Sequence, residues 1–214
     1  MAEKKRPRRT RERILETSLA LFNRFGAPHV TTADIADEMN ISPGNLYYHF
    51  GNKDEIVAAL YSAYEARMLP LLADPRGRHL QIDDLWLWLH LLIEETWGYR
   101  FFYGELDELT SRDRTLGMRF AALLRKSAAT VVEWSRGLTE AGTMHASDRE
   151  IEALAQNVML VAAYWSSYDR ICRAVRDTAD SDPGRAAYQV LALFGPYLTG
   201  EARVYLDRLS ADYL

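Results

Sequence analysis

The sequence predicts an all-α fold, because apolar residues recur at helical spacing along its 214 residues and almost never alternate with period two. No proline lies between Pro75 and Pro183, so long helices can run through this stretch without interruption. Prolines and glycines gather instead in three short stretches, at 27–28, 42–51 and 70–77. We therefore expect short helices up to about residue 50, then a connecting helix over about 52–71, then a bundle of longer helices.

The composition is that of an ordinary globular protein. Apolar types make up 48% of the chain and charged types 26%, and 214 residues suffice for one large domain or two modest ones. No apolar run approaches the roughly 18 residues of a membrane span, and the N-terminus is charged where a secretory signal would be apolar. The single cysteine, Cys172, excludes an intramolecular disulfide and a cysteine-cluster zinc site. We expect a soluble, cytoplasmic protein without a metal or other cofactor.

Formal charge is unevenly distributed along the chain. Residues 1–13 hold seven basic and two acidic side chains, a charge of +5, whereas residues 14–214 hold 19 basic and 28 acidic side chains, a charge of −9. A basic arm on an acidic body suggests an anionic partner for that end of the molecule. The alternative interpretation is a solvated, disordered tail.

Capping residues mark the first two expected helices. The first carries an apolar stripe over residues 14–25, with Thr10 as its N-cap and Gly26 as the glycine that ends it. The second begins at Thr31, which forms a variant of the capping box with Asp34 three residues later.

Residues 31–50, TTADIADEMNISPGNLYYHF, have capping and turn residues at the spacing of a helix-turn-helix. Ala36 is small where a second helix must cross closely. Asn40 falls at the turn, where a positive φ is needed, and asparagine tolerates that conformation better than most non-glycine residues. Ser42 then supplies an N-cap, and Pro43 a preset first position, for the following helix.

This following helix exposes residue types that a plain surface helix seldom uses. Leu46 and Phe50 share its inner face, and its other faces carry Gly44, Asn45, Tyr47, Tyr48 and His49. A solvated helix would more often use Lys, Glu and Ala, which are better helix formers. Aromatic side chains with hydrogen-bonding tips, and a glycine that permits close approach, suit insertion into the major groove of DNA.

The connecting helix is expected to begin after Asn52, with Glu55 at its third position as a reciprocal cap. Lys53 occupies the first position, where a cation opposes the helix dipole. A cation beside free backbone N–H groups forms an anion site, for which a DNA phosphate is the natural ligand. A solvated lysine is the alternative.

About residues 9–61 of the chain resemble the N-terminal DNA-binding domain of the tetracycline-repressor (TetR) family of bacterial transcriptional regulators. The most specific part of the resemblance is GNLYYHF with the lysine that follows it. Ala33 departs from members that place a base-reading arginine there. The resemblance implies a helix-turn-helix DNA-binding domain over 1–61 and a larger ligand-binding and dimerisation domain over 62–214. It implies DNA contacts from Thr31, Thr32, Ser42, Gly44, Asn45, Tyr47, Tyr48, His49 and Lys53.

Three long helices are expected in the second domain, over 116–138, from the Ser147–Glu150 capping box to about Cys172, and from Pro183 to Phe194. Asp182 is the predicted N-cap of the third, and Gly195–Pro196 should break it before a short helix resumes at about residue 201.

One stretch of these helices, 158–165, is apolar nearly all round and should therefore be buried on two sides. The last two long helices, about 148–175 and 183–200, could form a four-helix homodimer interface around a two-fold axis. The alternative is the central helix of a monomeric bundle. We favour the dimer, because half-site recognition needs two helices about one DNA turn apart.

Aromatic residues are concentrated between positions 86 and 103, and with later aromatics they could line a cavity for a mostly apolar small-molecule effector. The predicted lining residues are Trp97, Phe101, Phe102, Trp134, Tyr164, Trp165 and Tyr168. A plain core position is the alternative for each of them, because aromatics at helical spacing are more often core than ligand contacts.

His90 and Glu94 supply at most half of a metal site, and nothing in residues 62–214 assembles a nucleophile, a base and an oxyanion donor. We therefore expect no enzyme and no metal. The expected function is a ligand-responsive transcriptional regulator, a repressor, whose dimer binds a pseudo-palindromic operator and is released by its effector. The alternative is a DNA-binding protein whose body responds to a protein partner.

Overall fold

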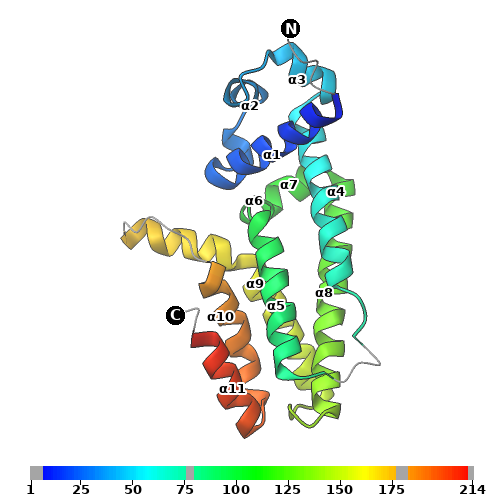
Figure 1. Ribbon diagram of the computed structural model, residues 1–214, viewed down its shortest axis with the longest axis vertical. Coiled ribbons are helices and arrows are strands. Elements are labelled where there is room, and N and C mark those ends of the chain that lie inside the picture. The colour runs from blue at the N-terminus through cyan, green and yellow to red at the C-terminus, as the bar shows by residue number, and fades with distance from the viewer. Residues whose placement is uncertain (1–6, 76–79, 177–182, 212–214) are drawn as a thin grey trace.

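The structure, a computed structural model, describes residues 7–75, 80–176 and 183–211. These residues form eleven α-helices and two 3-10 helices and no strand; Met144 and Leu198 make an isolated bridge. The predicted all-α fold is confirmed. The molecule is elongated, with a small helical head at one end and a helical body below it (Figure 1).

In the head, the two helices and the turn of the helix-turn-helix begin and end at the predicted capping and turn residues. The head contains α1 (Pro7–Phe25), the 3-10 helix η1 (Ala27–His29), α2 (Thr32–Glu38) and α3 (Pro43–His49). Thr31 and Asp34 form the full capping box, and Asn40 has a φ of 53° at the turn. Ala36 is completely buried where α2 and α3 meet, as the close crossing requires.

One boundary of the head was predicted wrongly. The first helix begins at Pro7 and not after Thr10, so Thr10 is helical and is not an N-cap. Proline is well suited to the first turn of a helix, and the arginines and glutamate that follow it are good helix formers. The rest of the basic arm (1–6) and the predicted cap Asp182 lie outside the described residues.

The body begins with α4, which leaves the head and runs down the side of the bundle (Figure 1). Its helices are α4 (Lys53–Leu71), α5 (Ile82–Gly98), α6 (Phe101–Gly104), α7 (Leu106–Arg112), α8 (Arg114–Glu140), α9 (Asp148–Arg176), α10 (Pro183–Phe194), η2 (Gly195–Tyr197) and α11 (Gly200–Ser210). The capping box at Ser147 and the break at 195–196 occur as predicted. In the described part of the chain, no helix combines the length and apolarity that crossing a membrane requires.

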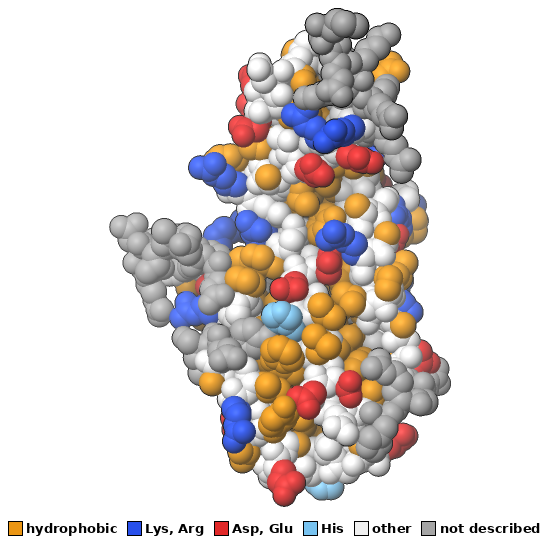
Figure 2. All heavy atoms as spheres, in the orientation of Figure 1, with side chains coloured by type: hydrophobic (Ala, Val, Ile, Leu, Met, Phe, Trp, Pro, Cys, Tyr) orange, Lys and Arg blue, Asp and Glu red, His pale blue; other side chains and the backbone are white. Residues whose placement is uncertain are grey.

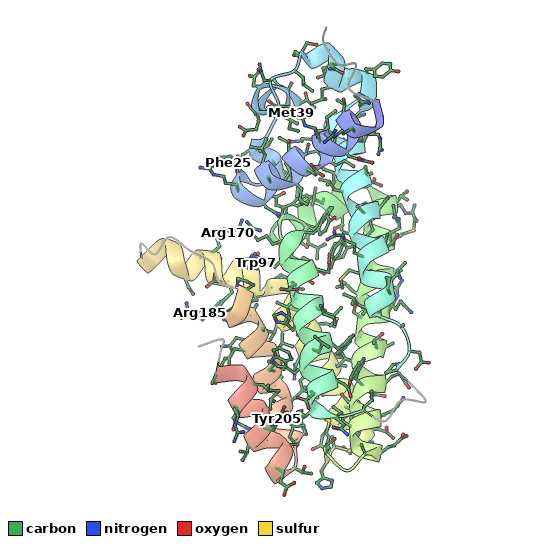
Figure 3. The ribbon with its side chains drawn as sticks, in the orientation of Figure 1. Phe25, Met39, Trp97, Arg170, Arg185 and Tyr205 are labelled. Atoms are coloured by element: carbon green, nitrogen blue, oxygen red, sulfur yellow. The ribbon has the colours of Figure 1, made fainter. Side chains whose placement is uncertain are left out.

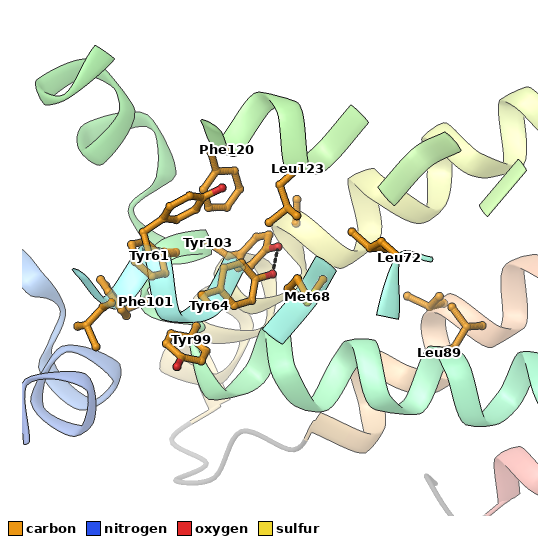
Figure 4. Packing of buried hydrophobic residues seen from close by; sticks show 14 of the residues in the cluster. Tyr61, Tyr64, Met68, Leu72, Leu89, Tyr99, Phe101, Tyr103, Phe120 and Leu123 are labelled. Atoms are coloured by element: carbon orange, nitrogen blue, oxygen red, sulfur yellow. Dashed lines mark hydrogen bonds between the residues drawn. The ribbon is translucent and has the colours of Figure 1, made fainter. Parts of the chain in front are cut away.

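An aromatic cluster joins α4 to the other helices of the body just below the head (Figure 4). The rings of Tyr61 and Phe102 lie edge to face with centroids 5.6 Å apart, and Phe120 of α8 packs against both. Beside them the hydroxyls of Tyr64 and Tyr103 share a buried hydrogen bond of 2.7 Å. Because α4 carries both Tyr61 and Tyr64, this cluster fixes the helix that links head and body.

Candidate DNA-binding surface and effector cavity

The second helix of the helix-turn-helix, α3, turns its aromatic side chains outward. Leu46 and Phe50 are buried, at 0% and 2% exposure, and anchor the helix to the head. Tyr47 and Tyr48 are 52% and 78% exposed. Two adjacent exposed rings on one short helix expose more apolar surface than a single residue would, and contiguous exposed apolar surface is typical of a contact site.

The start of α3 is shaped for close approach. The Ser42 hydroxyl accepts a hydrogen bond from the Asn45 N–H at 3.3 Å, which fixes the first turn. Apart from the neighbouring residues and the backbone of α3 itself, no atom of the described residues lies within 4 Å of the position that a Cβ on Gly44 would occupy. Packing within the chain therefore does not require glycine at this position, whereas approach of a second molecule would.

Contacts within the head hold the exposed rings in place. The Tyr47 hydroxyl lies 3.0 Å from the Thr32 hydroxyl, so α2 and α3 are tied together at their outer surface. The ring of Tyr48 meets that of His49 edge to face at 5.0 Å. The Thr31 backbone N–H and hydroxyl each donate to the Asp34 carboxylate at 2.7 Å, and these two bonds lower the pKa of Asp34. Thr31 therefore reaches a phosphate only by exchanging these bonds.

Lys53 has a structural role that sequence reasoning missed. Its ammonium donates to the carbonyl oxygens of Ala27 and Val30 at 2.7 and 3.1 Å. These carbonyls belong to the turn between α1 and α2, so the lysine ties that turn to α4. An ammonium has three donors, and two of them are used inside the protein. A phosphate contact would use the third.

We expect Lys53→Ala to lower the free energy of unfolding as well as DNA affinity. Removing the ammonium leaves two partly buried carbonyls without their charged donor, which costs about 1 kcal/mol or more. Urea unfolding and DNA binding of the same preparation measure both effects. Lys126→Ala, at an exposed position of α8, is the matched control. Unchanged stability of Lys53→Ala would contradict the structural role.

A second set of polar contacts joins the head to the body, and these contacts were not predicted from the sequence either. The Asn23 amide donates to the Gly98 carbonyl at 2.7 Å and accepts from the Phe101 N–H at 3.1 Å. The Glu105 carboxylate accepts from the Ala27 N–H at 3.0 and 3.1 Å.

Gly26, which has a φ of +85°, makes room for the Glu105 contact. A Cβ at this position would lie 2.6 Å from the Glu105 Oε1 atom. The glycine that ends α1 therefore also lets the body approach the head. The sequence signal for this second role is absent, since any helix-ending glycine would look the same.

Burial raises the pKa of Glu105 to about 7. The Glu108 carboxylate adds to the rise, and the Ala27 N–H and the charges of Arg170 and Lys53 oppose it. The native protein therefore holds this proton to higher pH than the unfolded chain, whose glutamate has the ordinary value of 4.5.

The free energy of unfolding should accordingly fall as the pH rises through the window from 4.5 to about 7. We expect Glu105→Gln to remove a fall of about 1–2 kcal/mol, a range that allows for solvent screening of this half-exposed group. Urea unfolding of both proteins across this pH range measures the difference. Parallel pH profiles would show that Glu105 does not titrate in this window.

An apolar cavity lies in the body where α4, α5, α6, α8, α9 and α10 meet, with a volume of about 70 Å³. Two of the predicted residues, Trp97 and Trp165, line it, and Figure 3 places Trp97 at the end of α5 beside α9. Its remaining walls are mostly aliphatic side chains, which include Met68, Leu89, Leu92, Ile93, Leu124, Val131, Val158, Met159 and Val190.

The other five predicted lining residues do not line this cavity. Phe101 and Phe102 are buried in the aromatic cluster below the head, which we call the junction core. Trp134 stacks on Trp88 with ring centroids 4.8 Å apart. Tyr164 and Tyr168 point outward and are 55% and 60% exposed. Helical spacing places these aromatic residues on apolar faces of their helices. It does not tell whether such a face packs in the core, lines the cavity or lies in solvent.

Tyr164 and Tyr168 belong instead to an exposed apolar stripe on α9. With Leu160 and Ile171 they recur every three or four residues, and all four side chains are at least 55% exposed. The C-terminal part of α9 extends away from the body (Figure 1). The stretch 158–165 thus has one side toward the core and one toward solvent.

The polar groups of the cavity are few. The Arg100 guanidinium donates to the Trp97 carbonyl at 3.2 Å and lies 5.0 Å from the centre of the Trp97 ring. Burial lowers the pKa of this guanidinium. No cluster of three potential metal ligands occurs among the residues that the structure describes. His90 pairs with Glu94 at 3.3 Å.

Comparison with known proteins agrees with this architecture. Residues 14–60 match the family model "Bacterial regulatory proteins, tetR family", and residues 63–206 match the model "Bacterial transcriptional repressor" of the same family. The chain is 40% identical over 48 residues to the probable acrEF/envCD operon repressor of Escherichia coli, which covers 22% of each chain. It is 28% identical over 126 residues to the E. coli regulator UidR, which covers 58% of this chain and 62% of that one.

These alignments span less than two thirds of the curated relatives. A solved structure matches over more of the chain: a TetR-family regulator from Marinobacter aquaeolei, 32% identical, with a TM-score of 0.83. That match covers 95% of this chain and 98% of the other. On these grounds the chain belongs to the TetR family of bacterial transcriptional regulators, with an N-terminal helix-turn-helix and a helical body.

Proposed function

We propose that this protein is a repressor that binds a pseudo-palindromic operator as a dimer and is released by a small, largely apolar effector. The observation that carries the DNA part is the orientation of α3, whose tyrosines face outward over a buried Leu46 and Phe50. Each α3 would enter a major groove, with Tyr47, Tyr48 and His49 against the bases.

The remaining predicted DNA contacts belong to the same proposal. Ser42, Gly44 and Asn45 lie at the start of α3, where the backbone can approach a phosphate or a base edge. Thr31, Thr32 and Lys53 would contact phosphates from the rim of this surface. The family consists of transcriptional regulators, so we assign this chain no catalytic role, and we place it in the cytoplasm, where bacterial DNA is.

The dimer would form through α9 and α10. The stripe of Leu160, Tyr164, Tyr168 and Ile171 supports this, because four exposed apolar side chains on one helix gain stability when a second copy covers them. A dimer also sets two α3 helices at a fixed spacing, as two half-sites require. We keep the domain division at 1–61 and 62–214 as part of the proposal.

The effector would bind in the apolar cavity. Trp97 and Arg100 of its wall directly precede the residues that hold Asn23 of the head, Gly98 and Phe101. A ligand that prefers one position of this segment would therefore shift the population of head positions. The size of this shift depends only on how much more tightly the effector binds one head position than the other, so the effector need not touch the head itself.

A protein partner in place of an effector is the second candidate. The observation in its favour is that three leucines of the neighbouring helices α4 and α5, Leu69, Leu87 and Leu91, are each at least 37% exposed. Figure 2 shows hydrophobic side chains gathered along the middle of the body on the side that α5 occupies. Exposed apolar surface of this kind, where it is contiguous, is typical of a site that binds another protein.

Selection of genomic fragments by the purified protein, followed by binding measurements on the selected duplex, tests the proposal. We expect two half-sites whose centres are about 10 base pairs apart, or a multiple of that, and an even number of chains per duplex. Inserting about 5 base pairs between the half-sites should abolish cooperative binding. One chain bound to an asymmetric site would contradict the proposed dimer.

A further inference from the structure

We propose that the cavity binds a slender apolar molecule ending in a carboxylate, which Arg100 and the indole N–H of Trp165 hold. This inference rests on the proposed function, in which the cavity takes a small effector, and it names the chemical class of that effector. Three features of the cavity lead to it: its charge, an indole donor without an acceptor, and the shape and chemistry of the remaining walls.

Charge is the first feature. Among the described residues that line the cavity, Arg100 alone carries a charge at neutral pH, and no Asp or Glu is present. Burial lowers the pKa of Arg100, and no acidic neighbour in the described part of the chain offsets this effect. A partly buried cation without an acidic neighbour favours an anionic ligand and disfavours a cationic one.

The geometry of Arg100 favours a carboxylate among anions. One N–H donates to the Trp97 carbonyl at 3.2 Å, and the guanidinium lies over the Trp97 ring, so the last turn of α5 holds the side chain in place. A guanidinium carries five N–H donors, which leaves a pair for a ligand. Two parallel N–H groups of this planar fork match the two oxygens of a carboxylate.

Trp165 supplies the second feature. It lines the cavity from α9, and its indole nitrogen is buried without a hydrogen-bond acceptor. Buried donors in native proteins are nearly always paired, so an unpaired donor on a residue that lines the cavity favours a ligand that brings an acceptor. A carboxylate oxygen accepts from an indole N–H and from a guanidinium at the same time, whereas an amine accepts from neither once protonated.

The remaining walls define the body of the ligand. They are mostly aliphatic side chains and the rings of two tryptophans and a tyrosine, with three small hydroxyl side chains among them (Thr96, Ser127 and Ser166), and the volume is about 70 Å³. A narrow apolar space favours an alkyl chain or a single ring over a polycyclic body. Arg100 directly precedes Phe101, whose N–H holds Asn23 of the head, so the carboxylate would bind at the point from which a shift reaches α1.

Three probes with the same eight-carbon chain test the inference: octanoate, 1-octanol and octylamine. Calorimetric titration of the full-length protein at neutral pH should give octanoate on the order of tenfold tighter binding than octanol, with octylamine the weakest. In Arg100→Gln the affinity for octanoate should fall to that for octanol. Arg136→Gln, which removes an equivalent charge from the exposed side of α8, should leave the preference unchanged.

Two further variants separate the contribution of the positive charge from those of the planar guanidinium and the indole N–H. Arg100→Lys keeps the charge without the planar fork and should retain part of the preference for octanoate. Trp165→Phe should weaken octanoate severalfold while leaving octylamine the weakest probe. If Arg100→Gln does not fold, the inference is tested by the Arg100→Lys variant together with the affinities of the wild-type protein for the three probes.

Equal affinities of wild-type protein for octanoate and octanol would overturn the inference, as would tighter binding of octylamine, no binding of any probe, or a preference that survives Arg100→Gln. Operator binding measured on the same preparation separates this result from failure of the proposed function. Binding of octanoate that depends on Arg100 but leaves operator affinity unchanged would uphold the site and reject its role as an effector site.

Discussion

Tyr48→Ala is expected to weaken operator binding about 100-fold without changing stability. The ring is 78% exposed and touches only His49 among the aromatic contacts of the head, so folding gains little from it. A good contact to a base is worth about 1–3 kcal/mol, and a dimer loses two copies of it. Competition binding at fixed salt concentration measures the loss, since affinities for DNA depend steeply on salt.

Two variants make this result specific. Phe25→Ala removes another exposed aromatic ring of the head, 49% exposed at the end of α1, and should leave operator affinity unchanged. Tyr48→Phe separates the ring from the hydroxyl. Wild-type affinity in Tyr48→Ala, with urea unfolding also unchanged, would mean that α3 does not contact the bases through this residue.

Phe102→Ala is expected to lower the free energy of unfolding by about 3–5 kcal/mol. The ring is 1% exposed and packs between Tyr61 of α4 and Phe120 of α8, so its loss leaves a cavity in the core that connects head and body. The loss should appear without any ligand, because Phe102 belongs to the core and not to the cavity wall. Urea unfolding measures it directly.

The matched control is Leu87→Ala on α5, where the side chain is 50% exposed and a change within about 0.5 kcal/mol is expected. A loss below 1 kcal/mol in Phe102→Ala would contradict the assignment of the ring to the junction core. Loss of ligand affinity at unchanged stability would instead restore the prediction, made from the sequence, that Phe102 contacts the effector.

Local signals made the head predictable from the sequence. The capping box at Thr31, the positive φ at Asn40 and the start of α3 at Ser42–Pro43 each depend on residues within four positions of one another. The burial of Leu46 against the exposure of Tyr48 follows from helical periodicity alone. Such features are encoded locally, so tertiary packing did not alter them.

Features that depend on distant residues were not predictable. Lys53 finds its carbonyl acceptors 23 and 26 positions away, and Glu105 finds the Ala27 N–H 78 positions away. Nothing in the sequence around these residues indicates such partners. The cavity shows the same limit, because only Trp97 and Trp165 of the seven predicted aromatics line it, and which apolar face meets which other face is decided by the packing of six helices.

Methylation interference on the selected operator tests the central claim, that α3 enters the major groove, most directly. Dimethyl sulfate methylates guanine N7 in the major groove and adenine N3 in the minor groove, so one experiment probes both. We predict two clusters of guanines at which methylation blocks binding, with centres about 10 base pairs apart or a multiple of that. Interference confined to adenines, with binding indifferent to methylated guanines throughout the site, would contradict the account.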